Sequence, residues 1–525
     1  MTRPQTLLLF WIAIVAIALF ANIGSTPLFD ADEGRNGEVG REMAETNDYV
    51  MPRIDGMPYL DKPVVYFAAE ALAMEVLGPT ELAARLPAYL FTLATAAVLF
   101  WFARRVWDAE SACVAVIAFL SMPLVLAFSR TVIFDSALAF FVVVALVAFY
   151  EAIEQPVKRP LPSLIAWAAI GFGVITKGPV AILLPLIVAI PFAIRQKRFR
   201  ALWSWWGLVA FVVIVAPWVY GVTRVVPDFL KYVLVTETAQ RLATKALKRT
   251  GPPWYFIPYL IGGALPWAIV ALAGIRSRWT ERDRAMLYAF LWIAIPFLFF
   301  SISQSKRPQY ILPVMPAVAL LVARTAKGLR AAAVTWIAVG AVLIAAPPFL
   351  KMRSELLGPA KTSAIALGVI ALIAGLAAAF IKRRELVIIA LSIPVIAMPI
   401  AADPLLKAIG ERRSAHQFAE QLRPYVKPST QIVGIEAYTG SLQFYLRKPV
   451  TVVTPDAEEF TSNYIIRHYD AFAGGKWNVR RPPADMQCCP DRIYVVRNDD
   501  RVNRAQLEAG GHRLIAEGAH FAGYR

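Results

Sequence analysis

The first residues suited to chemistry follow a long apolar segment near the N-terminus. The stretch Asp30–Arg35 contains three carboxylates and one guanidinium, and Lys62 follows within Leu60-Asp61-Lys62-Pro63. Ionisable side chains next to an apolar segment are costly unless they are paired or used. We therefore predict that Asp32, Arg35 and Lys62 belong to a functional site, in which the two cations can bind an anion. Further site candidates in this region are Glu33 and Asp61.

The charged residues that follow Arg35 have a simpler explanation. Glu38, Arg41, Glu42 and Glu45 are spaced three or four residues apart, so they would share one face of a helix. Such a face is typical of a helix that lies at a membrane surface. We expect these four side chains to be solvated and to have no part in the site.

Asp135 and Lys177 are isolated charges next to apolar segments. Asp135 begins the segment Asp135-Ser-Ala-Leu-Ala-Phe-Phe, where it could serve a site or cap a helix N-terminus. The residues alone leave both roles of Asp135 open. Lys177 lies in Thr-Lys-Gly-Pro between two apolar segments, where it could belong to the site or extend its amine to the membrane surface.

Two further clusters bring together cations and aromatic residues. Lys306 and Tyr310 lie in Ser-Lys-Arg-Pro-Gln-Tyr, and Arg241 lies in a basic stretch that also contains Glu237. Arginine and lysine bind phosphate by charge-assisted hydrogen bonds. We predict that Lys306, Tyr310 and Arg241 hold a phosphate together with Arg35 and Lys62, and that Glu237 lies nearby.

The elements that position these residues are membrane helices. The chain of 525 residues is 58% hydrophobic and 17% charged, which is more apolar surface than a soluble core can bury. About thirteen apolar segments approach the length needed to cross a bilayer. Their centres lie near Val15, Thr92, Ile117, Val143, Ala168, Leu186, Val212, Ile261, Phe290, Ala317, Ala338, Ile370 and Ala390.

Basic clusters between the apolar segments predict the orientation of the chain. If the N-terminus is cytoplasmic, the clusters at Arg104–Arg105, Arg195–Arg200 and Lys382–Arg384 all face the cytoplasm. The first loop, residues 30–78, then lies outside. We predict a membrane domain over residues 1–401 and a soluble α/β domain over residues 402–525, in which QIVGIEAY, KPVTVVT and DRIYVVRN form short strands. The site and this second domain then lie on the outer side of the membrane.

The composition also limits the classes of function. The net charge of +17 is spread over short clusters between apolar segments, which is typical of membrane topology and not of nucleic-acid binding. The sequence contains no Walker loop, HExxH motif or nucleophile elbow. We expect no required cofactor, although Asp32 and Asp61 could together hold a divalent metal.

Five motifs, taken in order, resemble a known family. They are ADEGRNGEVGREM, YLDKPVVYF, ITKGPVA, PPWYFIPYLIGGALPW and SKRPQYILPVMPAVA. Their order and spacing are similar to those of the bacterial aminoarabinose transferases of lipid A, which lie within the protein-mannosyltransferase-like GT-C superfamily. The resemblance implies a GT-C fold, about thirteen transmembrane helices and a small periplasmic C-terminal domain. It also implies that Asp32 and Asp135 are the catalytic carboxylates, and that Arg35, Lys62, Arg241 and Tyr310 hold the donor phosphate. Such a protein would lie in a bacterial inner membrane, with its site facing the periplasm.

The implied reaction is the inverting transfer of a sugar from undecaprenyl phosphate to lipid A or another envelope acceptor, by a monomer embedded in membrane lipid. Asp61 stands where the family has glutamate, and the family's histidine before its Pro-Trp motif is absent. The sugar could therefore be an aminoarabinose-like pentose, galacturonic acid or another hexose. A protein O-mannosyltransferase and a lipid-linked sugar flippase or transporter remain as alternatives.

Overall fold

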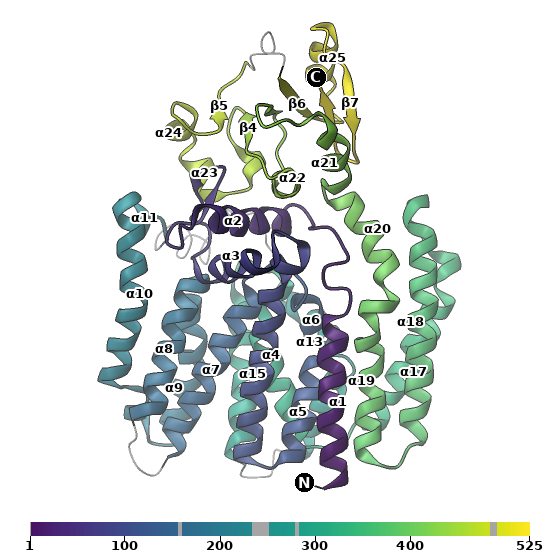
Figure 1. Ribbon diagram of the computed structural model, residues 1–525. Helices are drawn as coiled ribbons and strands as arrows, with labels where there is room; N and C mark the ends of the chain where they lie inside the picture. The colour runs from purple at the N-terminus through teal and green to yellow at the C-terminus, as the bar shows by residue number, and fades with distance from the viewer. Residues whose placement is uncertain (1, 156–159, 234–250, 279–282, 484–490) are drawn as a thin grey trace. The chain divides into compact units, whose positions relative to one another are not determined.

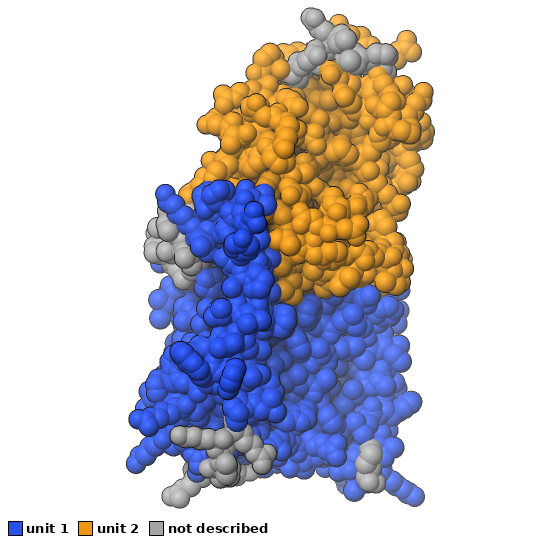
Figure 2. Space-filling view, turned by 60° about the vertical axis from the view of Figure 1, so that its left-hand side comes forward, with its two compact units in different colours: residues 1–23, 86–405 blue, residues 24–85, 406–525 orange. Residues whose placement is uncertain are grey.

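The computed structural model of the protein describes residues 2–155, 160–233, 251–278, 283–483 and 491–525. The chain forms two compact units, one of Met1–Ile23 with Leu86–Leu405 and one of Gly24–Arg85 with Leu406–Arg525 (Figure 2). We call them unit 1 and unit 2. The first loop thus falls in the same unit as the C-terminal region, whereas the sequence assigned it to the membrane part. The predicted domain boundary at residue 402 stays a prediction.

Unit 1 is helical in its described part, and its helices run along one another in a bundle (Figure 1). Its α-helices are α1 (Arg3–Phe20), α4 (Glu81–Val106), α5 (Ala109–Leu120), α6 (Pro123–Phe128), α7 (Asp135–Glu154), α8 (Pro160–Lys177), α9 (Val180–Arg195), α10 (Trp205–Val225), α11 (Phe229–Lys231), α13 (Phe256–Gly263), α14 (Trp267–Arg278), α15 (Arg284–Ile302), α16 (Met315–Ala323), α17 (Leu329–Ala345), α18 (Ser354–Phe380) and α19 (Arg384–Ala401). The boundaries between the units fall within α4 and α20 (Asp403–Arg413) and after Ile23.

Several helix starts are fixed by side chains that cap them. Asp108 accepts a hydrogen bond from the amide of Ser111 at 2.8 Å, and Asp283 accepts one from the amide of Ala285 at 2.9 Å. These bonds satisfy amide groups that have no partner within the helix. The polar residues between the apolar segments therefore determine where α5 and α15 begin.

The apolar helices match the segments predicted from the sequence. In the described part of the chain, eight helices are long and apolar enough to cross a membrane, and a ninth span is possible if the pair bent by 109° at Gly263–Trp267 is counted as one. Four shorter apolar helices are α5, α9, the Pro308–Ala323 segment and α17. Each predicted centre falls within one of these elements. The chain is therefore a multi-pass membrane protein, as predicted.

Unit 2 combines the helices of the first loop with a mixed sheet. The loop contributes α2 (Asp32–Thr46), α3 (Val65–Leu77) and a two-stranded ribbon of β1 (Arg53–Ile54) and β2 (Met57–Pro58). The six-stranded sheet has the order β5-β4-β3-β6-β8-β7, in which β3, β4, β5 and β6 are parallel and β7 and β8 antiparallel. Its strands are β3 (Gln431–Ile435), β4 (Val450–Val453), β5 (Val479–Arg480), β6 (Arg492–Arg497), β7 (Leu514–Glu517) and β8 (Phe521–Tyr524).

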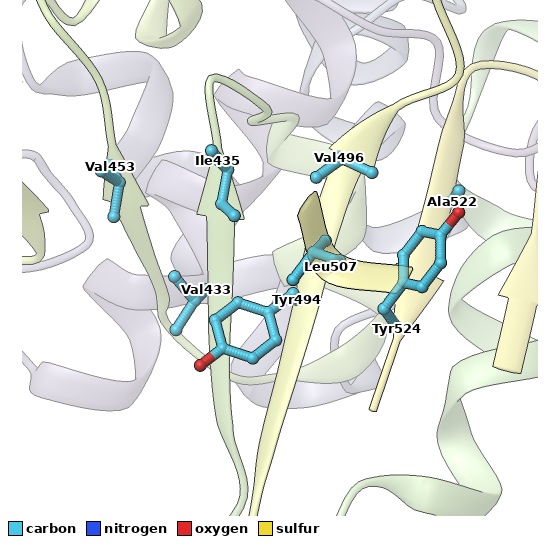
Figure 3. Close-up of a cluster of buried hydrophobic side chains, with 8 residues drawn as sticks. All are labelled: Val433, Ile435, Val453, Tyr494, Val496, Leu507, Ala522 and Tyr524. Atoms are coloured by element: carbon cyan, nitrogen blue, oxygen red, sulfur yellow. The ribbon is translucent and has the colours of Figure 1, made fainter. Parts of the chain in front are cut away.

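An apolar cluster on one face of this sheet stabilises unit 2. Val433, Ile435, Tyr494 and Val496 alternate along β3 and β6, so their side chains point to the same face, where Leu507 of α25 (Arg501–Ala509) covers them (Figure 3). The remaining members are Val453, Ala522 and Tyr524. The three strands predicted from the sequence are β3, β4 and β6, and the prediction of a small C-terminal α/β region is confirmed.

Candidate active site

Helix α2 carries the first predicted site residues and is buried in spite of its polar sequence. It packs against α3 and against α22 (Gly440–Leu446) of the C-terminal region. Glycines allow this close approach. A Cβ atom on Gly34 would lie 2.6 Å from the amide nitrogen of Ser441, and one on Gly40 would lie 2.8 Å from the Cβ atom of Glu70. The glycines at every third position are the signal in the sequence that could have predicted this burial.

Asp32 and Arg35 form an ion pair on α2. The Arg35 Nη2 atom lies 2.8 Å from the Asp32 Oδ1 atom, and the Arg35 guanidinium also donates to the carbonyl oxygen of Thr461 at 3.2 Å and to its hydroxyl. The Asp32 side chain is 50% exposed, whereas that of Arg35 is 12% exposed. A fixed guanidinium therefore lies beside a carboxylate that a substrate can reach.

The surroundings keep Arg35 charged. Its guanidinium carbon lies 5.8 Å from the centroid of the Tyr59 ring. Burial disfavours the charge, but the interactions with Tyr59 and with the carboxylates of Asp32 and Asp61 outweigh it and raise the pKa of Arg35 above its ordinary value. Arg35 can thus present a permanent positive charge to an anion. No motif of the sequence predicts Tyr59 and Thr461 as its neighbours.

Asp61 and Lys62 are adjacent in sequence but make different contacts. The two carboxylate oxygens of Asp61 accept hydrogen bonds from the amides of Asn463 and Tyr464, at 2.9 and 3.1 Å. These amides begin α23 (Asn463–Arg467), so Asp61 ties the first loop to the C-terminal region. The Lys62 amine donates to the carbonyl oxygen of Asp61 and is half-buried. A backbone carbonyl carries no net charge, so this contact does not neutralise the ammonium of Lys62.

Glu33 is a buried partner of Arg85. Its carboxylate oxygens accept hydrogen bonds from Arg85 at 2.8 and 3.1 Å, and one of them also accepts the amide of Phe29 at 3.1 Å. Both side chains of the pair are almost fully buried. These contacts favour a structural role for Glu33 over the role in the site that the sequence predicted.

The expectation that Glu38 and Arg41 lie on a solvated face is wrong. Glu38 is 2% exposed and Arg41 is 5% exposed, because α2 is covered on this side within unit 2. The two side chains form a buried bidentate ion pair at 2.6 and 2.7 Å. Burial raises the pKa of Glu38, and burial followed by the charge of Glu38 raises that of Glu42 to about 7.

In unit 1, Asp135 and Lys177 meet at the ends of α7 and α8. Asp135 occupies the first turn of α7 and accepts a hydrogen bond from the ammonium of Lys177, in the last turn of α8. Their side chains are 4% and 13% exposed. The same ammonium lies 5.1 Å from the centroid of the Tyr310 ring. The structure thus brings three predicted residues together, and an ion pair replaces the simple extension of Lys177 to the membrane surface.

Lys306 has a set of carbonyl partners at the end of α15. Its amine donates to the carbonyl oxygens of Ser301 at 2.7 Å, Phe300 at 3.4 Å and Ser303. A cation at this place stabilises the last turn of a helix. Binding of a phosphate by Lys306 stays a prediction. The predictions for Arg241 and Glu237 lie outside the described residues.

The candidate residues therefore form one set in each unit. Unit 2 holds Asp32, Arg35 and Lys62, and unit 1 holds Asp135, Lys177 and Tyr310. Within the described ranges, no three carboxylate, histidine or cysteine side chains are grouped so that they could hold a metal ion. The metal proposed at Asp32 and Asp61 gains no support from this part of the chain. In unit 2, the two cations can bind an anion, and the Asp32 carboxylate can orient or deprotonate a nucleophile.

The sequence of the chain is similar to those of a group of enzymes. A family model described as "Dolichyl-phosphate-mannose-protein mannosyltransferase" matches residues 61–220. The undecaprenyl phosphate-alpha-4-amino-4-deoxy-L-arabinose arabinosyl transferase of Shewanella sediminis is 31% identical over 321 residues, which is 60% of this chain and 58% of that one. The enzyme of the same name from Serratia proteamaculans is 33% identical, over 61% of this chain and 60% of its own length. The chain thus matches less than two thirds of the length of these curated relatives.

The fold comparison extends over the whole chain. The crystal structure of ArnT from Cupriavidus metallidurans bound to undecaprenyl phosphate superposes with a TM-score of 0.87 and 24% identity, covering 99% of this chain and 98% of that one. Its apo form gives a TM-score of 0.84. The chain therefore has the GT-C fold of this structure, as the sequence predicted. Within this class, the sequence comparisons confirm the similarity to the bacterial aminoarabinose transferases that the five motifs predicted.

Proposed function

We propose that the protein is an inverting glycosyltransferase that moves an aminoarabinose-like sugar from undecaprenyl phosphate to lipid A or another envelope acceptor. The observation that supports it most is the Asp32–Arg35 pair, on a chain whose sequence relatives are named as arabinosyl transferases. The ArnT structure with undecaprenyl phosphate bound shares the fold. A donor with a phosphate leaving group suits this site, because Arg35 and Lys62 of the first loop are both cations that bind phosphate.

In the proposed mechanism, the bond between the sugar's anomeric carbon and the donor phosphate breaks while a bond to the acceptor oxygen forms. The electron pair leaves with the polyprenyl phosphate, whose charge Arg35 and Lys62 stabilise. An acceptor phosphate is already anionic and needs no base, so Asp32 then orients the reacting groups. If the acceptor is a hydroxyl, Asp32 takes its proton. A single displacement inverts the anomeric centre.

The proposal places the protein in a bacterial inner membrane, with the site facing the periplasm and the chain acting as a monomer. The basic loops support this orientation because such loops remain on the cytoplasmic side. One observation favours a second candidate function. The description of the family model that matches residues 61–220 names a transferase of mannose to protein. The alternative function is therefore the transfer of a hexose, or transfer to a protein acceptor.

The test is a transfer assay with the purified full-length protein in detergent. We expect radiolabelled sugar to pass from undecaprenyl phosphate to lipid A, and we expect Asp32→Asn and Lys62→Ala each to abolish transfer while the protein stays folded. The matched controls are Asp470→Asn and Lys476→Ala, which alter exposed side chains of unit 2.

Three results would count against the proposal. Near-normal transfer by Asp32→Asn would remove this residue from catalysis. Movement of lipid-linked sugar across vesicles without transfer by the wild-type protein would make the protein a transporter. Glycans on protein, with lipid A unmodified, would favour the mannosyltransferase alternative.

A further inference from the structure

A cavity of about 750 Å³ lies within unit 2, and among the residues to which a function has been assigned, Arg35 borders it. Segments that follow β3 and β6 line it, among them Glu436, Thr439 and Asn498, together with Ala519 and His520 from the β7–β8 turn. Its volume falls within the range of sites for small molecules, about 300–1,000 Å³. The cavity is therefore large enough to hold a ligand of several rings.

The topology of the sheet explains why the cavity lies here. From β3 the chain proceeds to β4 and β5 on one side and then returns to β6 on the other side of β3. At such a reversal the loops after the two central strands diverge and leave a crevice at their carboxyl ends. This crevice is the usual ligand site of open parallel sheets. The position alone thus predicts a binding site in unit 2.

The backbone at the cavity is held in costly conformations. Glu436 and Thr461 both line it and have φ values of 46° and 51°, in the left-handed region that non-glycine residues avoid. Hydrogen bonds hold them there: the Glu436 amide donates to Val453 at 2.8 Å and the Thr461 amide to Glu458 at 3.0 Å. Residues in such conformations cluster at ligand sites, where the fixed geometry serves binding.

The charges of the lining disfavour an anionic ligand. Five carboxylates stand against three guanidiniums. Arg497 donates to both oxygens of Asp499 at 3.0 Å, and Arg35 belongs to the phosphate site proposed above. The lining carboxylates are Asp30, Glu436, Glu458, Glu459 and Asp499. A phosphate would meet net repulsion here, whereas hydroxyl and amine groups would find acceptors.

The lining also offers aromatic surface. Phe418 and Phe521 both border the cavity, with ring centroids 6.2 Å apart, and Tyr438 lies on its wall. Sugar rings combine hydroxyl groups with apolar C–H faces, so they match a lining of carboxylates, amides and rings. A polyprenyl chain would leave the carboxylates without partners, which is costly.

We propose that this cavity binds the saccharide part of the acceptor. The inference rests on the proposed function and names the acceptor's hydroxyl-rich headgroup as its ligand. Arg35 connects the two sites, because it lines the cavity and also pairs with Asp32. The cavity would bind the sugar rings of the acceptor, which do not react. This binding would position the reactive oxygen of the acceptor at the carboxylate of Asp32.

The kinetic test fills the cavity without touching the reacting groups. Ala519→Trp places an indole in the cavity, and Ala509→Trp places the same group on the exposed end of α25 as the matched control. For Ala519→Trp we expect the acceptor KM to rise by about tenfold or more while the donor KM and kcat stay near wild type. Glu436→Gln should raise the acceptor KM in the same direction and serves if the tryptophan variant does not fold.

A binding test separates this inference from the proposed function. Saturation-transfer NMR on the detergent-solubilised full chain, with a soluble glucosamine disaccharide as the probe, needs no transfer. We expect signals with wild type and Ala509→Trp that are lost with Ala519→Trp, and no displacement of the disaccharide by inorganic phosphate. A wild-type protein that transfers no sugar would contradict the function but leave this result standing.

Three outcomes would overturn the inference. One is transfer with an unchanged acceptor KM in folded Ala519→Trp and Glu436→Gln. The others are the absence of a disaccharide signal with wild-type protein and displacement of the disaccharide by phosphate, which would make the cavity an anion site.

Discussion

The ammonium of Lys177 and the carboxylate of Asp135 form an ion pair between α8 and α7, and both side chains are largely buried. Removing one member of such a pair leaves an unpaired buried charge, which costs about 3–5 kcal/mol. We expect Asp135→Ala to lower the free energy of unfolding by this order. Thermal unfolding in detergent measures it. The double variant Asp135→Ala/Lys177→Met should recover most of the loss, because it removes both charges.

The same variants separate catalysis from stability. If Asp135 takes part in the reaction, as the sequence predicts, the double variant is folded and inactive. Normal transfer by the double variant would limit the pair to a structural function, and equal stability of the single and double variants would contradict the expected cost of the lone charge.

Asp61 and Lys62 should respond differently to substitution although they are neighbours. Asp61→Ala removes the acceptor of two part-buried amides at the start of α23 and should lower the free energy of unfolding by about 1–3 kcal/mol. Lys62→Ala removes the hydrogen bond that the half-buried amine donates to a backbone carbonyl, and it should change stability less while abolishing transfer. Melting temperature and transfer rate, measured on both variants, give the comparison. A stable, inactive Asp61→Ala would instead place this carboxylate in the reaction.

The parts of the structure that depend on local pattern could be predicted from the sequence. The apolar segments predicted the helices because each must satisfy its own backbone in lipid. The spacing of Asp32 and Arg35 placed them one helical turn apart, where they form their pair. The strands β3, β4 and β6 followed from β-branched runs between turns.

The parts of the structure that depend on long-range packing could not be predicted from the sequence. Arg35 meets Thr461 across 426 residues, and no local pattern records this contact. The burial of Glu38 and Arg41 was missed because a run of charged residues at helical spacing reads as a solvated face. Only the tertiary contacts of α2 with α3 and α22 show that this face is covered.

Gly40 tests how tightly α2 packs. An added Cβ atom would lie 2.8 Å from the Cβ atom of Glu70, so one of the two helices must shift. We expect Gly40→Ala to lower the free energy of unfolding by about 1–3 kcal/mol, in spite of the better helix propensity of alanine. The control is Gly358→Ala in α18, where an added Cβ atom meets no atom within 4 Å. This control should be neutral or slightly stabilising. Equal melting temperatures for the two variants would show that α2 can move without cost.

Glu42 should make the stability of the protein depend on pH near neutrality. Burial, followed by the charge of Glu38, raises its pKa from 4.5 to about 7, while the Gly56 amide donates to it at 2.8 Å. The folded protein therefore holds this proton more tightly than the unfolded chain. The contribution of Glu42 to stability is greatest below pH 4.5, is lost as the pH rises through 7 and stays lost above it, by about 3 kcal/mol for this shift.

Glu42→Gln removes this titration but keeps an acceptor for the Gly56 amide. We expect the variant to melt at a higher temperature than wild type at pH 8 and to lose much of the difference at pH 5, in scans of the purified protein. Glu45→Gln, on the same helix with an exposed side chain, is the control and should leave the wild-type slope in place. Other buried carboxylates, among them Glu38, Asp55 and Glu70, keep part of the pH dependence in both variants, because burial raises their pKa values as well. A Glu42→Gln variant with the full wild-type slope would mean that Glu42 is not the group that titrates.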